Sequence, residues 1–147
     1  MKLQVSSRIA IYALLELATK PGGQVSVAHI GAKYRISSHH LAKVMKVLSR
    51  AGLVRSVRGA GGGSQFCGNA RRVTLLDVIE LFEKVGARAA ADKPGEETGE
   101  GRVLRHVLYE IDDISRATFG SITLATMLKL LERQRDGQRR HAAVPAG

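Results

Sequence analysis

Apolar residues recur every three or four positions along most of the chain, which is the spacing of one buried face of an α-helix. The first predicted helix runs from about Val5 to Thr19, and the segment "KPGG" at 20–23 ends it. Neither an internal repeat nor a strand-rich region interrupts this pattern. The sequence therefore predicts a mainly α protein. Its later helices are expected at 27–34, 38–51, 75–84, from about 102 to a C-cap at Gly120, and from Leu124 to about Arg135.

Hydroxyl side chains mark where several of these helices begin. Ser26, Ser37 and Thr74 each follow an apolar residue, and another apolar residue comes four positions later, where it can pack back on the first turn. Asp77 follows Thr74 by three residues and completes a capping box. Thr123 is the corresponding N-cap of the last predicted helix. These signals fix helix starts more firmly than residue propensity does.

Two short helices separated by "YRIS" at 34–37 predict a helix-turn-helix, the scaffold that presents its second helix to the major groove of DNA. The core face of that second helix is expected at Leu41, Val44, Met45 and Leu48. Its opposite face carries hydrogen-bond donors and cations, namely Ser38, His39, His40, Lys43 and Lys46. The lysines suit phosphates, and the histidines could reach base edges or phosphates. An ordinary charged helix face is the alternative, which the segments that follow make less favoured.

The segment "LVRSVRGAGGGSQF" at 53–66 has two short β-forming stretches around a glycine-rich tip, which predicts a two-stranded hairpin. A hairpin at this point would be the wing of a winged helix-turn-helix. Arg58 is expected to enter the minor groove, while Gly59 and Gly62 allow the backbone to approach a phosphate. A nucleotide-binding loop also uses glycines, but it needs a Gly-Lys-Ser/Thr ending and a following helix, and "GGGSQF" offers neither.

Positive charge is concentrated in the first half of the chain. Of 147 residues with a net charge of +10, residues 1–72 hold 5 Lys and 7 Arg against one acid, Glu16, whereas residues 73–147 are close to neutral. This asymmetry favours a nucleic-acid-binding module over an evenly basic surface. A structural RNA-binding or ribosome-associated protein is an alternative, although aromatic residues for base stacking are only 4%. No arrangement of nucleophile and base indicates an enzyme.

Cys67 is the only cysteine, so the chain has no intramolecular disulfide and is compatible with a reducing cytoplasm. Its thiol is expected to be a half-buried packing group beside the second wing strand, and a redox or metal role is the less favoured alternative. The histidines are too scattered for a zinc site. Arg8 and Glu16 interrupt the apolar N-terminus, and no run reaches the ~20 residues of a membrane span. We therefore expect a cytoplasmic protein without a membrane partner.

Several motifs together resemble those of the Rrf2 family of transcriptional regulators. "MKLQVSSRIAIYALLELA" resembles the first helix of the family, and "ISSHHLAKVMKVLSRAGLVRSVRGAGGG" resembles its recognition helix and wing. "VTLLDVIELFE" resembles the helix after the wing, and "SITLATML" resembles the turn that closes the dimerisation element. The resemblance covers about residues 1–132. It implies a bacterial, homodimeric, winged-helix repressor or activator that binds double-stranded DNA.

The resemblance also implies which residues contact DNA. His39, His40 and Lys43 match the contacting turn of the family's recognition helix, and Arg58 with its neighbouring glycines matches the wing tip. Two such units related by a twofold axis would meet half-sites about one helical turn apart, ~34–36 Å, on a roughly palindromic operator.

The residues with which several members of the family sense their signal are not matched in this sequence. Several members hold an iron–sulfur cluster with three cysteines in a loop that corresponds to residues 85–101, and this loop has no cysteine. Because each chain of a dimer offers only Cys67, we expect no cluster cofactor. An unknown small-molecule effector could instead bind between the dimerisation helix and the winged domain.

A long amphipathic helix follows the loop. Its apolar stripe recurs every three or four residues at Leu104, Val107 or Leu108, Ile111, Ile114 and Thr118. The stripe predicts packing on a partner copy, and an element of the intrachain core is the alternative. The expected organisation is a winged helix-turn-helix domain at 1–84, a flexible loop at 85–101, dimerisation helices at 102–136 and a basic flexible tail at 137–147.

Overall fold

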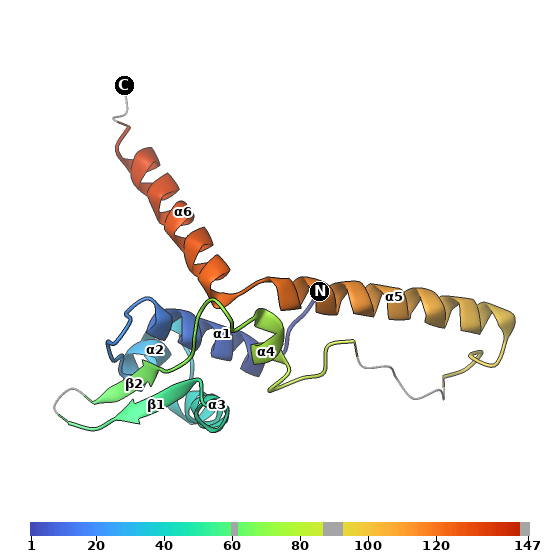
Figure 1. The fold of residues 1–147 in the computed structure, drawn as a ribbon, viewed down its shortest axis with the longest axis horizontal. Helices are drawn as coiled ribbons and strands as arrows, with labels where there is room; N and C mark the ends of the chain where they lie inside the picture. Colours follow the sequence, from blue (N-terminus) through green and yellow to red (C-terminus); the bar gives the residue numbers. More distant parts are fainter. Residues whose placement is uncertain (60–61, 87–92, 145–147) are drawn as a thin grey trace.

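The computed structural model describes residues 1–59, 62–86 and 93–144. Within them the chain forms six α-helices and one two-stranded antiparallel sheet, with α5 and α6 projecting from the body in different directions (Figure 1). The predicted class, mainly α with a small hairpin, is confirmed. In chain order the elements are α1 (Val5–Ala18), α2 (Val27–Tyr34), α3 (Ser38–Arg50), β1 (Val54–Val57), β2 (Gly63–Phe66), α4 (Leu75–Ile79), α5 (Gly99–Ser121) and α6 (Leu124–Ala142).

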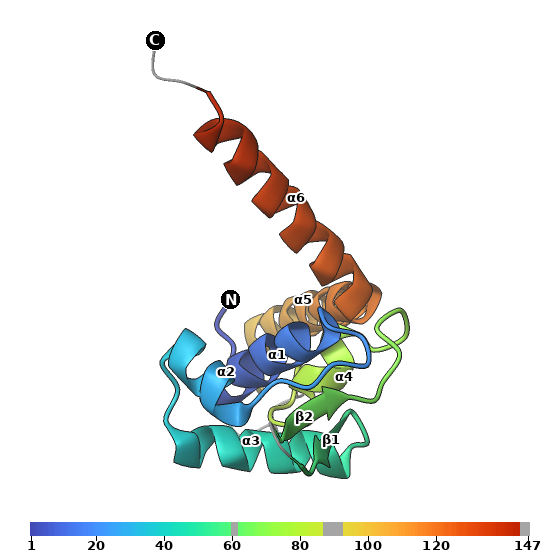
Figure 2. The ribbon, with the colours of Figure 1, turned by 90° about the vertical axis from the view of Figure 1, so that its left-hand side faces the viewer.

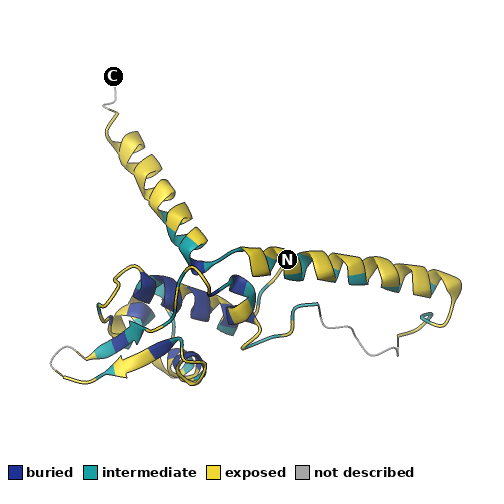
Figure 3. Ribbon diagram, viewed as in Figure 1, coloured by how far each residue is buried: buried dark blue, intermediate teal, exposed yellow. Residues whose placement is uncertain are grey.

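Helix α1 lies at the centre of the core and is dark blue along most of its length in Figure 3. It contacts α2, α3, α4, α6 and β2. Ala10 and Ala13 let neighbouring backbones approach closely, while Leu14 and Leu17 fill the space between them, and all four are fully buried. The other large side chains that are completely buried come from the elements around α1; they are Ile30, Leu41, Leu48, Ile79 and Leu124.

The helix starts predicted from hydroxyl caps are confirmed. The hydroxyl of Ser26 accepts a hydrogen bond from the His29 backbone N–H at 3.1 Å, and that of Ser37 accepts one from the His40 N–H at 3.2 Å. Thr74 forms the complete capping box expected at α4. Each cap satisfies a backbone donor that the first helical turn leaves without a partner.

The start of α1 is capped in a way the sequence pattern did not indicate. Gln4 occupies the N-cap position without a side-chain cap of its own. The Glu83 carboxylate, from the segment after α4, accepts the Gln4 N–H at 2.8 Å and the hydroxyl of buried Ser7 at 2.5 Å. Its negative charge also lies at the positive end of the α1 dipole. Glu83 therefore ties α1 to the α4 region.

The hairpin pairs in the register Val54↔Phe66 to Val57↔Gly63. The tip end of β2 is joined to the segment before α2 by two backbone hydrogen bonds between Val25 and Ser64, at 3.0 and 2.9 Å. Gly63 allows this approach, because a Cβ there would lie 2.5 Å from the Val25 carbonyl oxygen. The wing is thus attached to the rest of the domain through the start of β2, close to its tip.

The corner between α5 and α6 is attached to the same core. The Leu75 N–H donates to the Ile122 carbonyl at 2.8 Å, and the Leu124 N–H donates to the Val73 carbonyl at 2.9 Å. Leu124 itself is completely buried. The predicted boundary between a winged domain and C-terminal helices therefore crosses a continuous core.

Several helix bounds differ from the predicted ones. α4 ends at Ile79 instead of 84, because the chain then continues in tight i→i−3 turns at Leu81 and Phe82. α5 continues past the expected C-cap at Gly120 to Ser121, and Ile122 then becomes extended to pair with the segment before α4. Gly120 lies beside α4, where a Cβ would make only an ordinary contact, 3.5 Å from Leu76 Cδ2.

The expected loop and tail are also partly ordered. Residues 87–92 and 145–147 lie outside the described residues, but 93–98 form a turn against the first residues of α5. Thr98 caps α5, which begins at Gly99 rather than 102. α6 reaches Ala142 rather than 135, because the arginines and glutamines of this segment are good helix formers.

Glu16 holds α2 against α1. Its carboxylate accepts hydrogen bonds from the Lys33 ammonium and, at 2.7 Å, from the Tyr34 hydroxyl, and His29 Nε2 lies 3.9 Å away. Partial burial alone would raise the pKa of Glu16, but these hydrogen bonds and the nearby positive charges outweigh it and keep the pKa below its ordinary value. Burial and the bond to Glu16 raise the pKa of Tyr34, whose ring stacks on Tyr12 at 5.0 Å.

Replacing Gly63 tests the attachment of the wing. We expect Gly63→Ala to lower the free energy of unfolding by ~1–3 kcal/mol, because the added methyl must push the Val25 backbone away. Gly137→Ala is the matched control, since Gly137 lies in exposed α6 with nothing within 4 Å of its Cβ position, and it should leave stability unchanged or slightly raised. Urea denaturation followed by circular dichroism measures both; equal effects would contradict the attachment.

The Glu16 contact predicts a pH dependence. Glu16→Gln should lower the free energy of unfolding at pH 7 by ~1–2 kcal/mol, because a neutral amide replaces a charged acceptor. The pKa of Glu16 is lower in the folded chain, so the carboxylate stabilises the fold above the unfolded value near 4.5 and loses this effect as pH falls through the folded value. Urea titrations between pH 7 and 3 should therefore show the two proteins converging in acid. A constant difference is the contrary result.

Candidate nucleic-acid interface

The turn between α2 and α3 is tight and fixes the angle between the two helices. Arg35 ends α2 in the left-handed region, with φ 55° and ψ 48°. The Ile36 N–H then donates to the Gly31 carbonyl at 2.9 Å. Gly31 permits this return of the chain, because a Cβ there would lie 3.2 Å from the Ile36 carbonyl oxygen. The turn thus sets the direction of α3.

Helix α3 divides into two faces as its sequence predicts. Leu41, Val44, Met45 and Leu48 are buried in the core. Ser38, His39, Lys43 and Lys46 are exposed, and His40 is half-buried. Both ribbon views place α3 and the hairpin on the side of the molecule away from α6 (Figure 2). The predicted recognition helix and wing therefore share one accessible side.

The two adjacent histidines have different surroundings. His40 Nε2 lies 3.2 Å from the Ser6 hydroxyl of α1, within hydrogen-bond distance. Its ring is therefore held toward the start of α1. His39 makes no hydrogen bond within the described chain and remains exposed. Both line a cavity of about 570 Å³ along α3, to which Lys43 and Phe82 also contribute.

Arg50 extends the cationic side of α3 and was missed in the sequence. With His39, Lys43 and Lys46 it occupies positions i, i+4, i+7 and i+11, which lie on one helix face. It is exposed at the last residue of the helix. The same spacing argument that separated the core residues could have found it.

The cations on this side have no partner among the residues that the structure describes. Lys43, Lys46 and Arg50 form neither a hydrogen bond nor an ion pair there, and the same holds for Arg58 of the wing. Arg55, by contrast, donates two hydrogen bonds to the Gln65 side chain at 2.8 and 2.6 Å. The unpaired charges create an electropositive surface that can neutralise the phosphates of a polyanion.

Arg58 follows the last residue of β1 and is exposed at the edge of the wing tip. Residues 60–61 of the tip lie outside the described chain. Gly59 has φ +129°, which other residues rarely adopt, and its carbonyl accepts the Gly62 N–H at 2.9 Å. A Cβ at Gly62 would lie 3.0 Å from the Val57 carbonyl oxygen. Both predicted glycines therefore serve the turn itself.

The apolar stripe of α5 is uncovered within the chain. Leu104, Val107, Leu108, Ile111 and Ile114 are 45 to 66% exposed, and Thr118 is exposed as well. Figure 3 shows α5 exposed along most of its length. The stripe is thus no part of the intrachain core, which was the alternative interpretation. A surface of this kind is typical of an interface with another protein chain.

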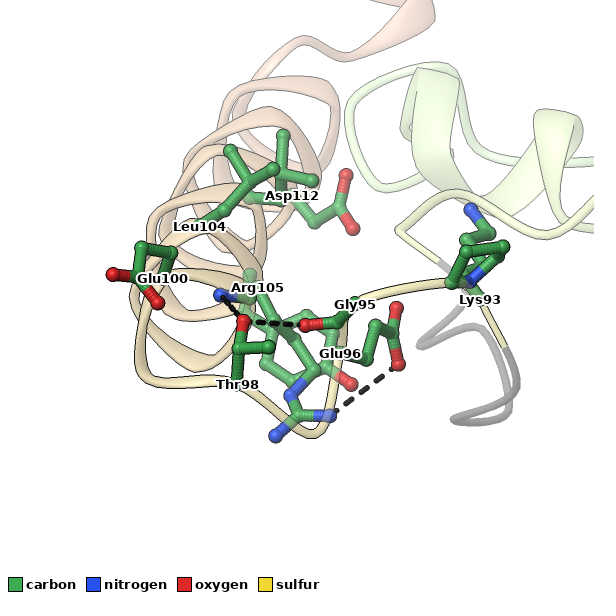
Figure 4. A pocket seen from close by; sticks show the side chains of 12 residues that line it. Lys93, Gly95, Glu96, Thr98, Glu100, Leu104, Arg105 and Asp112 are labelled. Carbon is green, nitrogen blue, oxygen red and sulfur yellow. Dashed lines mark hydrogen bonds and ion pairs between the residues drawn. The ribbon is translucent and has the colours of Figure 1, made fainter.

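A cavity of about 580 Å³ lies between α5 and the turn at 93–98 (Figure 4). Arg105 forms an ion pair across it with Glu96, at 3.3 Å, and Leu104 and Leu108 provide apolar lining. The turn packs closely, because a Cβ on Gly101 would lie 2.1 Å from the Gly95 carbonyl oxygen. This cavity is built by the turn and α5 rather than by the winged domain.

Cys67 is exposed, so the expectation of a half-buried packing thiol is wrong. Its N–H continues the hairpin by donating to the Leu53 carbonyl at 2.9 Å, but Ser64 is the buried side chain of this strand. Among the described residues, no three His, Cys, Asp or Glu side chains are grouped to hold a metal ion. A single cysteine per chain does not fit an all-thiolate iron–sulfur cluster.

Comparison with known proteins agrees with this geometry. A family model described as Rrf2, iron-dependent transcriptional regulator, matches residues 3–130. The putative HTH-type transcriptional regulator BadM of Rhodopseudomonas palustris is 47% identical over 138 residues, covering 92% of this chain and 86% of the relative. The HTH-type transcriptional regulator IscR of Xenorhabdus nematophila is 33% identical, covering 88% and 80%.

Solved structures show the same fold. That of CymR, the global cysteine regulator of B. subtilis, has a TM-score of 0.75 at 27% identity and covers 88% of this chain and 98% of its own. T. potens IscR has a TM-score of 0.65 at 28% identity, covering 100% and 94%. Within the described part of this chain, we find no helix with the length and hydropathy to cross a membrane. By sequence and fold, the chain belongs to the Rrf2 family of winged helix-turn-helix transcriptional regulators.

Proposed function

We propose that the protein is a homodimeric regulator that binds a roughly palindromic operator in a sequence-specific manner. The observation that carries this proposal is the row of unpaired cations on the exposed face of α3, beside a wing whose Arg58 is also unpaired. In this arrangement α3 enters the major groove and the wing follows the adjacent minor groove. The family membership of the chain supports the same activity.

The side chains of α3 would divide the work of recognition. Ser38 and His39 lie in its first turn, the end that normally approaches base edges. Lys43 and Lys46 follow on the same side and suit phosphates, which fix position without reading sequence. His40 is bonded to Ser6, so we propose that it positions α3 against α1 and contacts DNA with its remaining exposed edge.

The uncovered stripe of α5 supports the dimer. In a dimer the stripes of two copies would cover each other, which removes apolar surface from water. A twofold axis would then place two α3 helices on successive major grooves, ~34–36 Å apart.

We further propose that the protein acts in the cytoplasm, where bacterial DNA lies, and that it has no enzymatic activity. Its signal would come from a small-molecule effector instead of an iron–sulfur cluster, since the chain has a single, exposed cysteine. The cavity between α5 and the turn at 93–98 is a candidate effector site, because it lies on the helix proposed to join the two copies.

Charge removal on α3 and the wing tests DNA binding. We expect Lys43→Gln and Arg58→Gln each to weaken binding to double-stranded DNA about 10-fold and to reduce its salt dependence, because each removes a phosphate or groove contact. Arg139→Gln on α6 is the control, since it removes the same charge from the side away from α3. Fluorescence anisotropy of a labelled duplex over a KCl series measures these effects.

Competition by duplex RNA in the same assay tests the regulator against the RNA-binding alternative. If it competed for the wild-type protein as well as DNA from the cognate promoter does, the structural RNA-binding alternative would replace the regulator. Genomic footprinting provides the promoter fragments and defines their symmetry.

A charge placed in the apolar stripe tests the dimer. Val107→Asp should weaken self-association at least ~100-fold, because a carboxylate would be buried without a partner, and DNA affinity should fall with it. Val144→Asp is the matched control, since Val144 is also exposed but lies beyond the end of α6. Sedimentation velocity reports the state of both. If the wild-type protein stayed monomeric at micromolar concentration, the proposed dimer would be contradicted.

A further inference from the structure

A cavity of about 250 Å³ lies between α1 and the turn of the helix-turn-helix. The apolar residues Val5, Ile9 and Ile36 line it, and so do two arginines from different elements, Arg8 of α1 and Arg35 at the end of α2. None of the described residues that line this cavity carries a carboxylate. The nearby acid, Glu16, is already paired with Lys33 and Tyr34 of α2, so the charge around the cavity is positive.

Neither arginine has a partner in the described chain. The side chains of Arg8 and Arg35 form no hydrogen bond or ion pair with the described residues, and both residues are exposed. Other arginines of the chain do find partners, such as Arg116, which pairs with Glu80 and donates to the Val85 carbonyl at 3.0 Å. Two free guanidinium groups that flank one cavity are an arrangement suited to a single anion.

The backbone conformation of Arg35 also supports a role in binding an anion. Among the described residues it is the one non-glycine residue with positive φ. Glycine would adopt this conformation without the steric cost of a Cβ. Arginine at this position therefore costs stability, and what it adds to the surface is a cation beside the recognition helix.

The cavity is continuous with the surface proposed to bind DNA. His40, in the first turn of α3, lines both this cavity and the larger one that Lys43 lines. The two cavities thus adjoin at the helix end that would enter the groove. A DNA strand that borders this groove would pass the α1 side of α3, because the helices before a recognition helix cross the backbone.

We infer that Arg8 and Arg35 together bind a backbone phosphate of the duplex at the edge of the groove that receives α3. This inference rests on the proposed function. DNA, rather than a free anion, is the occupant, since both guanidinium groups are exposed and their attraction for a lone ion is screened by solvent and salt. When α3 docks in the groove, the backbone phosphates of the duplex are already brought close to both arginines, so they need no separate binding step. The contact fixes the register of α3 and reads no sequence.

The double variant Arg8→Gln/Arg35→Gly tests the inference through the salt dependence of binding to a duplex of arbitrary sequence. Loss of one phosphate contact per copy, two per dimer, should reduce the slope of log K against log [KCl] by about 1.8 and leave sequence preference unchanged. Arg35→Gly alone should weaken binding while raising the melting temperature by about 2–4 °C, because it relieves the left-handed strain. Weaker binding by a more stable protein excludes unfolding as the cause.

Arg139→Gln/Arg140→Gln is the matched control, because it removes two unpaired charges from α6 and should leave the slope unchanged. An unchanged slope in the Arg8/Arg35 variant, alongside a reduced slope in Lys43→Gln, would overturn the phosphate contact and leave the regulator intact. No binding by the wild-type protein would instead overturn the proposed function. Inorganic phosphate, added at constant ionic strength, is a further test. If it displaced DNA from the wild-type protein but not from the Arg8/Arg35 variant, the cavity would be a site for a free anion and the inference would be overturned.

Discussion

Burial of α1 on nearly all sides is the constraint on which the rest of the structure depends. Its small and large apolar residues form the floor for α2, α3, α4, β2 and the start of α6. The polar residues of α1 are then used for fixed contacts: Ser6 with His40, Ser7 with Glu83, and Glu16 with α2. A helix surrounded in this way leaves its neighbours little freedom, so the surface formed by α3 and the wing is rigid before any ligand arrives.

The distribution of charge pairs explains why this rigid surface is electropositive. Acids of the chain are used where two elements meet: Glu16 joins α2 to α1, and Glu80 joins α4 to Arg116 of α5. Glu16 is also the only acid in the first 72 residues. Among the described residues no acid pairs with Lys43 or Lys46, and their charge remains for a partner outside the chain. The same carboxylates that assemble the fold thus leave the side proposed to bind DNA with unpaired positive charge.

Local patterns predicted the helix-turn-helix and the wing, whereas contacts between distant segments did not show in the sequence. The caps at Ser26, Ser37 and Thr74 depend on residues within one turn, so their spacing was sufficient. Glu83 caps α1 from far along the chain, and no periodicity indicates such a partner. Gly120 satisfied the local rule for a helix end, yet α5 continues to Ser121, and the chain leaves the helix where Ile122 pairs with the segment before α4. The contact residues on DNA remain predictions, although their exposure agrees with that role.

The attachment of α5 couples the proposed dimer to the proposed DNA contacts. Arg116 is bonded to Glu80 and to the Val85 carbonyl, and a Cβ on Gly86 would lie 2.9 Å from Asp112 Cβ, so α5 packs closely on the segment after α4. That segment carries Glu83, the cap of α1, and α1 in turn holds His40. A shift in how two α5 helices cross would therefore move each winged domain as one body. Half-site spacing then depends on the crossing of α5, and an effector beside Arg105 would act on DNA affinity by changing that crossing rather than by reshaping α3.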